Sequence, residues 1–209
     1  MSRVDLHIHS KYSGDNDSEP EEIIDKAIES GLDAIAFTEH YSYEASEFVE
    51  SLRHKYNSIK ILRGVEFSTP DGHCLIFGVN TDRLHIKDIP LNEVIDIVNL
   101  AGGVIIPTHP YRGVNSMGDT IRKVKGFSAI EGFNGLNMYH LNQKAIDVAR
   151  DLGLPYTGGS DAHRPVDVGS CYTEFDEPVT EDNIVEVLKR GNYYGMDKRK
   201  ISRIGERRI

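Results

Sequence analysis

Short apolar runs alternate with amphipathic stretches along almost the whole chain. Residues 4–9 (VDLHIH) alternate apolar and polar positions with the period of two that is typical of a β-strand. Residues 20–30 have the amphipathic pattern of a helix, with acidic side chains near its start and Gly31 directly after its end. The two patterns continue to follow one another, which indicates parallel α/β architecture.

The pattern predicts one α/β domain. The predicted strands cover residues 4–9, 33–38, 59–67, 103–108, 129–134, 155–159 and about 169–173. The predicted helices cover residues 20–30, 43–56, 91–101, 117–125, 139–152 and 180–190. A turn at 70–72 should return residues 73–79 as a hairpin arm. Repeated units of this size, without low-complexity linkers, predict a closed TIM-like barrel with seven strands.

Composition and charge narrow the possible partners. The chain has 209 residues, of which 39% are hydrophobic, enough for one core. Its net charge of −9 argues against a nucleic-acid coat or an anionic membrane as main partner. Residues 197–209 nevertheless carry six basic and two acidic side chains. We therefore expect a domain over 1–196 and a basic tail over 197–209, which is a solvated end, a nucleic-acid-contacting arm or an oligomer contact.

The remaining composition indicates a cytoplasmic protein. Cys74 and Cys171 form no CxxC pair, so neither a zinc knuckle nor a redox pair is expected. No apolar run is long enough to span a bilayer, and Met1 is followed at once by a predicted strand, with no room for a signal peptide.

Histidines and acids gather where apolar runs end. His7 and His9 stand two apart on the first predicted strand, so their rings share one face. Six of the nine histidines lie at such positions, whereas His54, His85 and His140 do not. The candidate metal ligands are His7, His9, Asp15, His40, Glu66, His73, His109, Asp161 and His163. In a barrel the carboxyl ends of all strands meet on one face, so residues far apart in the sequence can share a site.

The ligand types suggest a cluster of cations. Imidazole and carboxylate groups suit Zn²⁺, Mn²⁺ or Fe²⁺ about equally. Nine ligands are too many for one ion and suit two or three, with Glu66 as the bridging carboxylate. Clustered divalent ions generate hydroxide and clamp the oxygens of an in-line displacement. Phosphoester hydrolysis by a metal-bound hydroxide is the leading interpretation, and amide or lactone hydrolysis stays open.

The motifs HIHSKYSGD, TEH, GVE with the downstream His73, THP and SDAH resemble those of the PHP (polymerase and histidinol phosphatase) family of metal-dependent phosphoesterases. The resemblance runs over nearly the whole chain. It implies a distorted seven-stranded (β/α) barrel with a di- or trinuclear centre. It also implies that His7, His9, Glu66 and Asp161 hold one ion, that Glu66, His73 and His109 hold a second, and that Asp15, His40 and His163 hold a third.

Two positions depart from the family pattern. The first motif usually continues Ser-Asp-Gly, and here it reads Ser13-Gly14-Asp15, so Asp17 competes with Asp15 as a ligand. The second motif usually ends Thr-Asp-His, and here Glu39 replaces the aspartate. Only about thirty residues, 80–108, fill the interval where relatives carry a helical insertion, which predicts a shallow, open pocket.

A few other residues could contact substrate or support the ligands. Lys11, Arg112 and Arg164 follow candidate ligands and could bind phosphate, with solvated surface charge as the alternative. Asn134 and Asn137 could reach the pocket or could serve a turn, and Glu131 could orient a metal-bound histidine. The expected partner is a phosphorylated small molecule, a nucleotide or a nucleic-acid end. The alternatives are an amidohydrolase-like carboxamide or lactone hydrolase and a non-catalytic, metal-bearing accessory module.

Overall fold

β1 (Ser2–Ile8) is the central strand of a five-stranded sheet with the order β10-β9-β1-β2-β3. The computed structural model describes residues 1–40, 42–80, 84 and 88–199. β2 (Ala34–Phe37) pairs parallel with β1, and β3 (Lys60–Arg63) pairs parallel with β2. β9 (Cys171–Phe175) and β10 (Tyr193–Asp197) complete the sheet through antiparallel pairs. The carboxyl ends of β1, β2 and β3 therefore lie on one edge.

Two smaller sheets stand beside the first. β4 (Val65–Thr69), β5 (Gly72–Phe77) and β6 (Val104–Pro107) form an antiparallel sheet. β7 (Ile130–Asn134) and β8 (Tyr156–Gly159) form a parallel pair. Single parallel bridges join Ile8 to Ala162 and His40 to Glu66. These bridges bring strand ends from the three sheets together at the predicted site.

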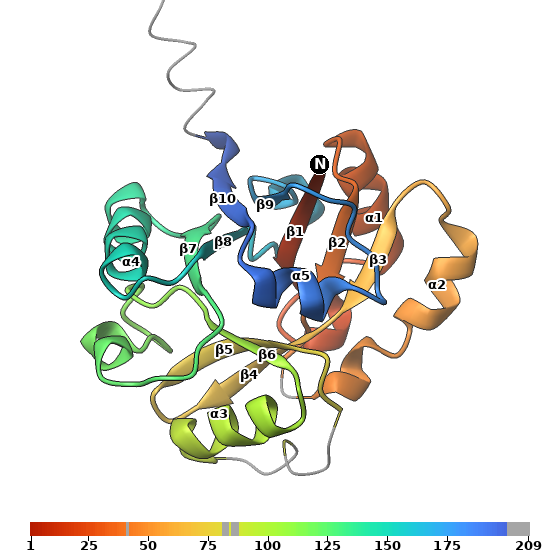
Figure 1. Ribbon diagram of the computed structural model, residues 1–209. Coiled ribbons are helices and arrows are strands. Elements are labelled where there is room, and N and C mark those ends of the chain that lie inside the picture. The colour runs from red at the N-terminus through yellow and green to blue at the C-terminus, as the bar shows by residue number, and fades with distance from the viewer. Residues whose placement is uncertain (41, 81–83, 85–87, 200–209) are drawn as a thin grey trace, which may run out of the picture.

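The helices cover the outer faces of the sheets, except for α5. Figure 1 shows α1 and α2 outside β1 to β3, α4 beside β7 and β8, and α5 between the large sheet and β4 to β6. The α-helices are α1 (Pro20–Glu29), α2 (Val49–Lys55), α3 (Leu91–Leu100), α4 (Tyr139–Asp151) and α5 (Ile184–Arg190). Short 3₁₀ helices cover Lys11–Ser13, Tyr43–Ser46, Gly118–Arg122 and Pro165–Asp167. Among the described helices, none has the length and apolarity needed to cross a membrane.

The core consists of an inner cluster and two outer ones. The inner cluster joins β1 and β2 to β5 and β6, for example through Leu6, Ala36, Leu75 and Ile106, and α5 adds Leu188. One outer cluster packs α1 and α2 against β1 to β3, and the other packs α3 and α4 against β4 to β7. The strands are thus held by apolar contact on both faces, which leaves their ends free to carry polar side chains.

The mixed α/β fold is confirmed, whereas the number and direction of the strands were predicted incorrectly. The described residues contain ten strands in three sheets instead of seven strands and one hairpin arm. The predicted arm, 73–79, is present as β5, antiparallel to β4. The predicted strand 59–67 is divided at Gly64 into β3 and β4, and a side chain at Gly64 would collide with the Phe77 ring of β5. The last predicted strand, β9, is antiparallel to β1. The predicted helix 117–125 is a 3₁₀ turn, and most of the predicted tail, 200–209, lies outside the described residues.

A buried carboxylate fastens β1 to the segments that follow β8. Asp5 is completely buried, and burial raises the pKa of Asp5 to about 6 against the opposing effect of its hydrogen bonds. Its carboxylate accepts hydrogen bonds from the backbone N–H groups of Ser160 and Gly169, each at 2.9 Å, and from that of His7 at 3.3 Å. This side chain therefore fixes the strand that bears His7 against the segment that bears Asp161.

Replacing Asp5 with alanine should lower the free energy of unfolding by roughly 2–4 kcal/mol, because buried N–H groups lose their acceptor. Asp33→Ala is the matched control, since the Asp33 carboxylate accepts one exposed bond from the Arg3 N–H and should cost under about 1 kcal/mol. Urea denaturation measures both variants. An Asp5→Ala variant as stable as the Asp33→Ala control would contradict this role.

Candidate metal centre

Strand ends and the loops after them carry all nine predicted ligands. His7 lies in β1 and His9 directly after it, and His40 follows β2. Glu66 and His73 lie in the antiparallel strands β4 and β5, His109 follows β6, and Asp161 and His163 follow β8. Asp15 lies in the loop between the first 3₁₀ helix and α1. The structure brings these residues together, and each is in contact with at least one other.

Four of them form a buried inner group. His7 Nε2 lies 3.4 Å from Glu66 Oε1 and 3.5 Å from Asp161 Oδ1. His9 Nε2 lies 3.4 Å from Glu66 Oε2 and 3.4 Å from Asp161 Oδ1. All four residues are at most 1% exposed. Two imidazoles and two carboxylates thus face a common point, and these four are the residues predicted to hold the first ion.

Glu66 also contacts the histidines around this group. Its Oε1 atom lies 2.9 Å from His109 Nε2 and 3.3 Å from His73 Nδ1, and its Oε2 atom lies 3.1 Å from His40 Nδ1. Thr108 donates a further hydrogen bond to Oε1 at 3.0 Å. Both carboxylate oxygens therefore face imidazole nitrogens, as expected of a bridging ligand.

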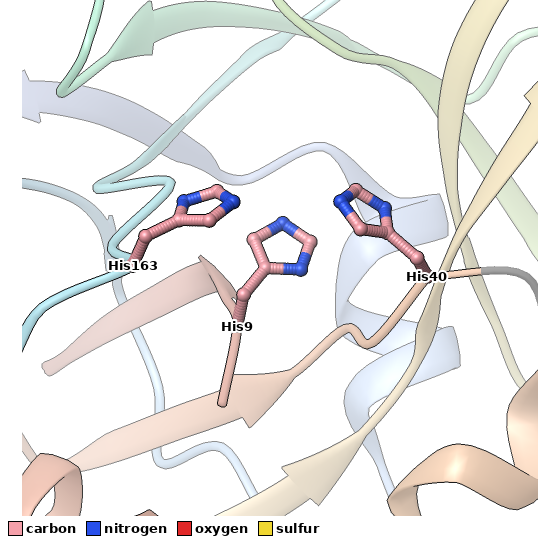
Figure 2. A group of neighbouring side chains, drawn as sticks. All are labelled: His9, His40 and His163. Carbon is pink, nitrogen blue, oxygen red and sulfur yellow. The ribbon is translucent and has the colours of Figure 1, made fainter. Parts of the chain in front are cut away.

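An outer group lies nearer to solvent. Figure 2 shows the rings of His40 and His163 on either side of His9, with nitrogen atoms of the three rings facing a shared space. Asp15 Oδ2 lies 3.1 Å from His40 Nε2 and 2.9 Å from His163 Nε2. Between the two candidate acids, it is Asp15 that contacts these histidines, whereas Asp17 is an exposed loop residue.

The grouping of ligands differs in part from the predicted one. Three sets of donor atoms lie within 4.8 Å of one another and could each hold an ion: His7, His9 and Glu66; His40, Glu66 and His73; and His9, His40 and His163. His9 and His40 each belong to two sets, whereas the prediction gave each to one ion. The rings of His9 and His40 lie 4.3 Å apart between centroids, so neighbouring sets share them.

The donor set fits divalent cations. Ligand atoms around one tetrahedral ion, at about 2.0–2.2 Å from it, lie roughly 3.3–3.6 Å apart, and the separations of 3.4 and 3.5 Å in the inner group match this. His109 Nδ1 is buried and has no hydrogen-bond partner among the described atoms. The other ring nitrogen, Nε2, faces Glu66, so Nδ1 is a buried polar atom whose partner can be an ion or a water.

Two buried carboxylates orient the ligand histidines from behind. Glu131 accepts a hydrogen bond from His7 Nδ1 at 2.7 Å and another from the His109 N–H at 2.7 Å. The predicted contact of Glu131 with a ligand histidine is therefore present. Glu39 is held by hydroxyl groups of Ser10 and Ser13, each at 2.5 Å, and does not point at the candidate ligands.

Sequence reasoning missed Ser13. Its hydroxyl donates a hydrogen bond to Glu39 and lies 2.9 Å from His9 Nδ1. Ser13 therefore links the buried Glu39 carboxylate to a candidate ligand. The signal was its position four residues after His9 in the first motif, but a serine in a loop has many ordinary uses.

The three predicted substrate-binding cations lie in different surroundings. Arg112 reaches the site, where its Nη2 group lies 2.5 Å from Asp161 Oδ2 and 2.7 Å from Asn134 Oδ1, and its Nε group donates to Asn137. Lys11 is paired with Glu19, and Arg164 is paired with Asp167 at the surface. A role for any of the three in substrate binding stays a prediction. His54 and His140 lie on helices as expected, and His85 lies outside the described residues.

Charge within the cluster displaces several pKa values. Burial lowers the pKa of His9, but hydrogen bonds to Asp161 and Glu66 outweigh burial and raise it to about 9. The pKa of His7 is likewise raised well above its usual value, because the charges of Asp161, Glu131 and Glu66 outweigh burial. Burial raises the pKa of Glu66 and Asp161, yet His7 and the other histidines hold both well below their usual range.

The metal-free protein should therefore lose stability as pH rises from 6.5 to 9. Protonated His7 and His9 stabilise the folded state fully below their unfolded pKa of about 6.5, and this contribution disappears as pH passes the folded pKa of His9, about 9. Glu66 and Asp161 stay ionised over this interval. Urea denaturation in the presence of a chelator, at pH 6.5, 7.5 and 9, measures the trend. His9→Asn should weaken it and the surface variant His54→Asn should keep it; a stability that rises with pH would contradict the charge balance.

Family models match two parts of the chain. The model described as PHP domain matches residues 5–128, and the model described as PHP-associated matches residues 140–193. An uncharacterized protein of Methanocaldococcus jannaschii is 28% identical over 149 residues, which is 66% of this chain and 83% of that protein.

Solved structures share the fold. A two-domain protein of Bacteroides vulgatus that contains a predicted PHP-like metal-dependent phosphoesterase is 20% identical, with a TM-score of 0.71 over 94% of this chain and 64% of that one. The lesion-specific endonuclease PfuEndoQ of Pyrococcus furiosus is 18% identical, with a TM-score of 0.70 over 93% of this chain and 57% of that one. The matched family model covers more than half of the sequence and includes seven of the nine candidate ligands. The chain belongs to the PHP domain family.

Proposed function

We propose that this protein is a metal-dependent phosphoesterase that hydrolyses a phosphomonoester or phosphodiester. The observation that carries the proposal is the buried carboxylate of Glu66, whose two oxygens face the five histidines His7, His9, His40, His73 and His109. A carboxylate in this position can join neighbouring cations. Membership of the PHP domain family and the likeness to a PHP-like phosphoesterase support the same reaction.

The proposed cofactors are two or three divalent ions, namely Zn²⁺, Mn²⁺ or Fe²⁺. The proposed ligands are His7, His9, Asp15, His40, Glu66, His73, His109, Asp161 and His163. Such ions, when bound, lower the pKa of a coordinated water and neutralise the charge of a phosphate. The protein's own task is to hold the ligand side chains in place, for which Glu131 fixes His7 and Ser13 fixes His9.

The proposed substrate is a phosphorylated small molecule, a nucleotide or a nucleic-acid end. The three carboxylates among the proposed ligands are Asp15, Glu66 and Asp161. Together they carry fewer negative charges than two or three divalent ions carry positive charges, so the metal-loaded site attracts an anion. Arg112, Lys11 and Arg164 are the proposed phosphate contacts, of which Arg112 is nearest to the ligands. The fold shared with a lesion-specific endonuclease is compatible with a nucleic-acid substrate.

We also propose that the strands of the three sheets close into a distorted barrel, which forms a domain over residues 1–196. The bridges from Ile8 to Ala162 and from His40 to Glu66 support closure, because they join the ends of separate sheets around the site. We also propose that the basic tail can contact nucleic acid. Most of this tail, residues 200–209, lies outside the described residues.

Glu66→Gln should reduce hydrolysis of p-nitrophenyl phosphate and bis-p-nitrophenyl phosphate by at least about 100-fold, because the shared carboxylate loses its charge. Chelation should have the same effect, and added Mn²⁺ or Zn²⁺ should restore activity in the parent only. Glu186→Gln, an exposed change of the same type in α5, should leave the rate unchanged.

Three results would contradict the assignment. Undiminished phosphoester hydrolysis in chelated protein would remove the metal requirement. Hydrolysis of p-nitrophenyl acetate or an amide without that of phosphoesters would favour the amidohydrolase alternative. A metal-loaded protein inert towards every ester would indicate an accessory module.

Ser13→Ala should weaken metal binding about 10-fold with little effect on the fold, because His9 loses the hydroxyl that fixes its ring. Calorimetric titration with Zn²⁺ measures this, and Ser13→Thr, which keeps the hydroxyl, should recover most of the affinity. Equal affinities in Ser13→Ala and the parent would show that Ser13 does not orient His9.

A further inference from the structure

Arg199 connects the end of β10 to a loop beside the metal centre. β10 lies beside β7 and β8 (Figure 1), and its last residue, Asp197, is followed two positions later by Arg199. The guanidinium of Arg199 donates to the backbone carbonyls of Gly135, Asn137 and Asn134, the last two at 3.3 Å. Three carbonyls of the short loop 134–137 therefore converge on one side chain.

The guanidinium is itself held in place. Its Nε and Nη2 groups each donate to the carboxylate of Asp197 at 3.0 Å, which is the fork-like geometry of a two-point pair. The Asp197 carboxylate is 4% exposed, and its backbone pairs with Cys171 in the ladder of β9 and β10. Arg199 thus joins the loop to the edge of the large sheet.

The same loop holds Arg112 against a candidate ligand. Asn134 Oδ1 and Asn137 Oδ1 accept hydrogen bonds from Arg112 at 2.7 and 2.9 Å. Arg112 and Asn134 then both donate to Asp161 Oδ2, at 2.5 and 3.1 Å. Asp161 Oδ1 is left to face His7 and His9.

Asp161 needs this support, and the loop has little freedom to move. The backbone of Asp161 has a φ of 54°, which an aspartate adopts at some cost. Gly135 N–H donates to the Gly159 carbonyl at 3.0 Å, and a Cβ at Gly135 would collide with the carbonyl of Ser160. A displacement of the loop would therefore be passed on to the residues just before Asp161.

We propose that Arg199 is a positioning residue for the metal centre, acting on Asp161 through the loop 134–137 and Arg112. This inference rests on the proposed function, because it concerns how Asp161 is presented to a metal ion. It also gives the first arginine of the basic tail a role in the folded domain. Lysine cannot replace it, since a single ammonium does not reproduce the fork that spans Asp197 and three carbonyls.

The test is metal affinity in the full chain. Mn²⁺ titration by calorimetry should show about 10-fold weaker binding in Arg199→Lys at unchanged stoichiometry. The loss should be partial, because Asn142 also holds the backbone of Asn134. Arg190→Lys is the matched control. Arg190, the last residue of α5, is paired with Glu177 and lies far in sequence from the loop 134–137. This change should leave the Mn²⁺ affinity unaltered.

A double-mutant cycle separates positioning from general support of the fold. The loss of Mn²⁺ affinity in Arg199→Lys with Arg112→Ala should be smaller than the sum of the single losses on a logarithmic scale, because both act through one chain of contacts. Should Arg199→Lys fail to fold, Asn137→Ala interrupts the same chain and should weaken Mn²⁺ binding as well.

The results distinguish the inference from the function on which it rests. If the parent binds Mn²⁺ and Arg199→Lys binds it within twofold while its melting temperature falls, Arg199 only supports the fold and the inference is overturned. Additive losses in the cycle would overturn it too. A parent protein that binds no Mn²⁺, Zn²⁺ or Fe²⁺ would overturn the proposed function itself.

Discussion

The structure depends on a single constraint, the burial of carboxylates and imidazoles at one point of an otherwise apolar core. Glu66 and Asp161 are almost fully inaccessible to water, and ionised carboxylates in such surroundings must be compensated by positive charge. In the metal-free protein the compensation comes from His7 and His9, whose pKa values rise accordingly. Divalent ions can replace those protons as the source of positive charge. The same side chains can therefore be stable with protonated histidines or with bound metal.

The fold supplies the positions that this constraint requires. The parallel strands β1 and β2 end at the same edge, and the bridges at Ile8 and His40 bring β8 and β4 to it. Behind the ligands lie further polar residues, of which Glu131 and Glu39 are buried carboxylates and Arg112 is the cation opposite Asp161. The supporting residues therefore come from all three sheets, since Glu131 lies in β7, Glu39 follows β2 and Arg112 follows β6.

The sequence was sufficient to predict residues that the fold brings together, and insufficient to predict how their donor atoms are arranged in space. His7, His9 and Glu66 could be found because ligand-type residues recur at the ends of apolar runs, and that spacing is a local property. The ion that a histidine can bind depends on where its ring nitrogens point in three dimensions. His9 and His40 each belong to two sets of neighbouring donor atoms. The strand count failed for a similar reason: between β3 and β4, the ring of Phe77 lies so close to Gly64 that a Cβ would collide with it, and no local sequence pattern indicates that contact.

Supporting contacts were the hardest to predict. The effect of Ser13 on His9 spans four residues, but that of Arg199 passes through Asn137 and Arg112 before it reaches Asp161. Neither residue type nor spacing in the sequence indicates a chain of that kind. Glu131 was recognised because it stands inside a strand, where a carboxylate needs a partner.

The most direct test of the central claim is anomalous X-ray diffraction from crystals of the protein grown with Mn²⁺ or Zn²⁺. The account predicts two or three anomalous peaks among the histidines, with a carboxylate oxygen of Glu66 within ligand distance of more than one. A map in which no peak lies within ligand distance of Glu66, in a protein saturated with metal, would contradict it.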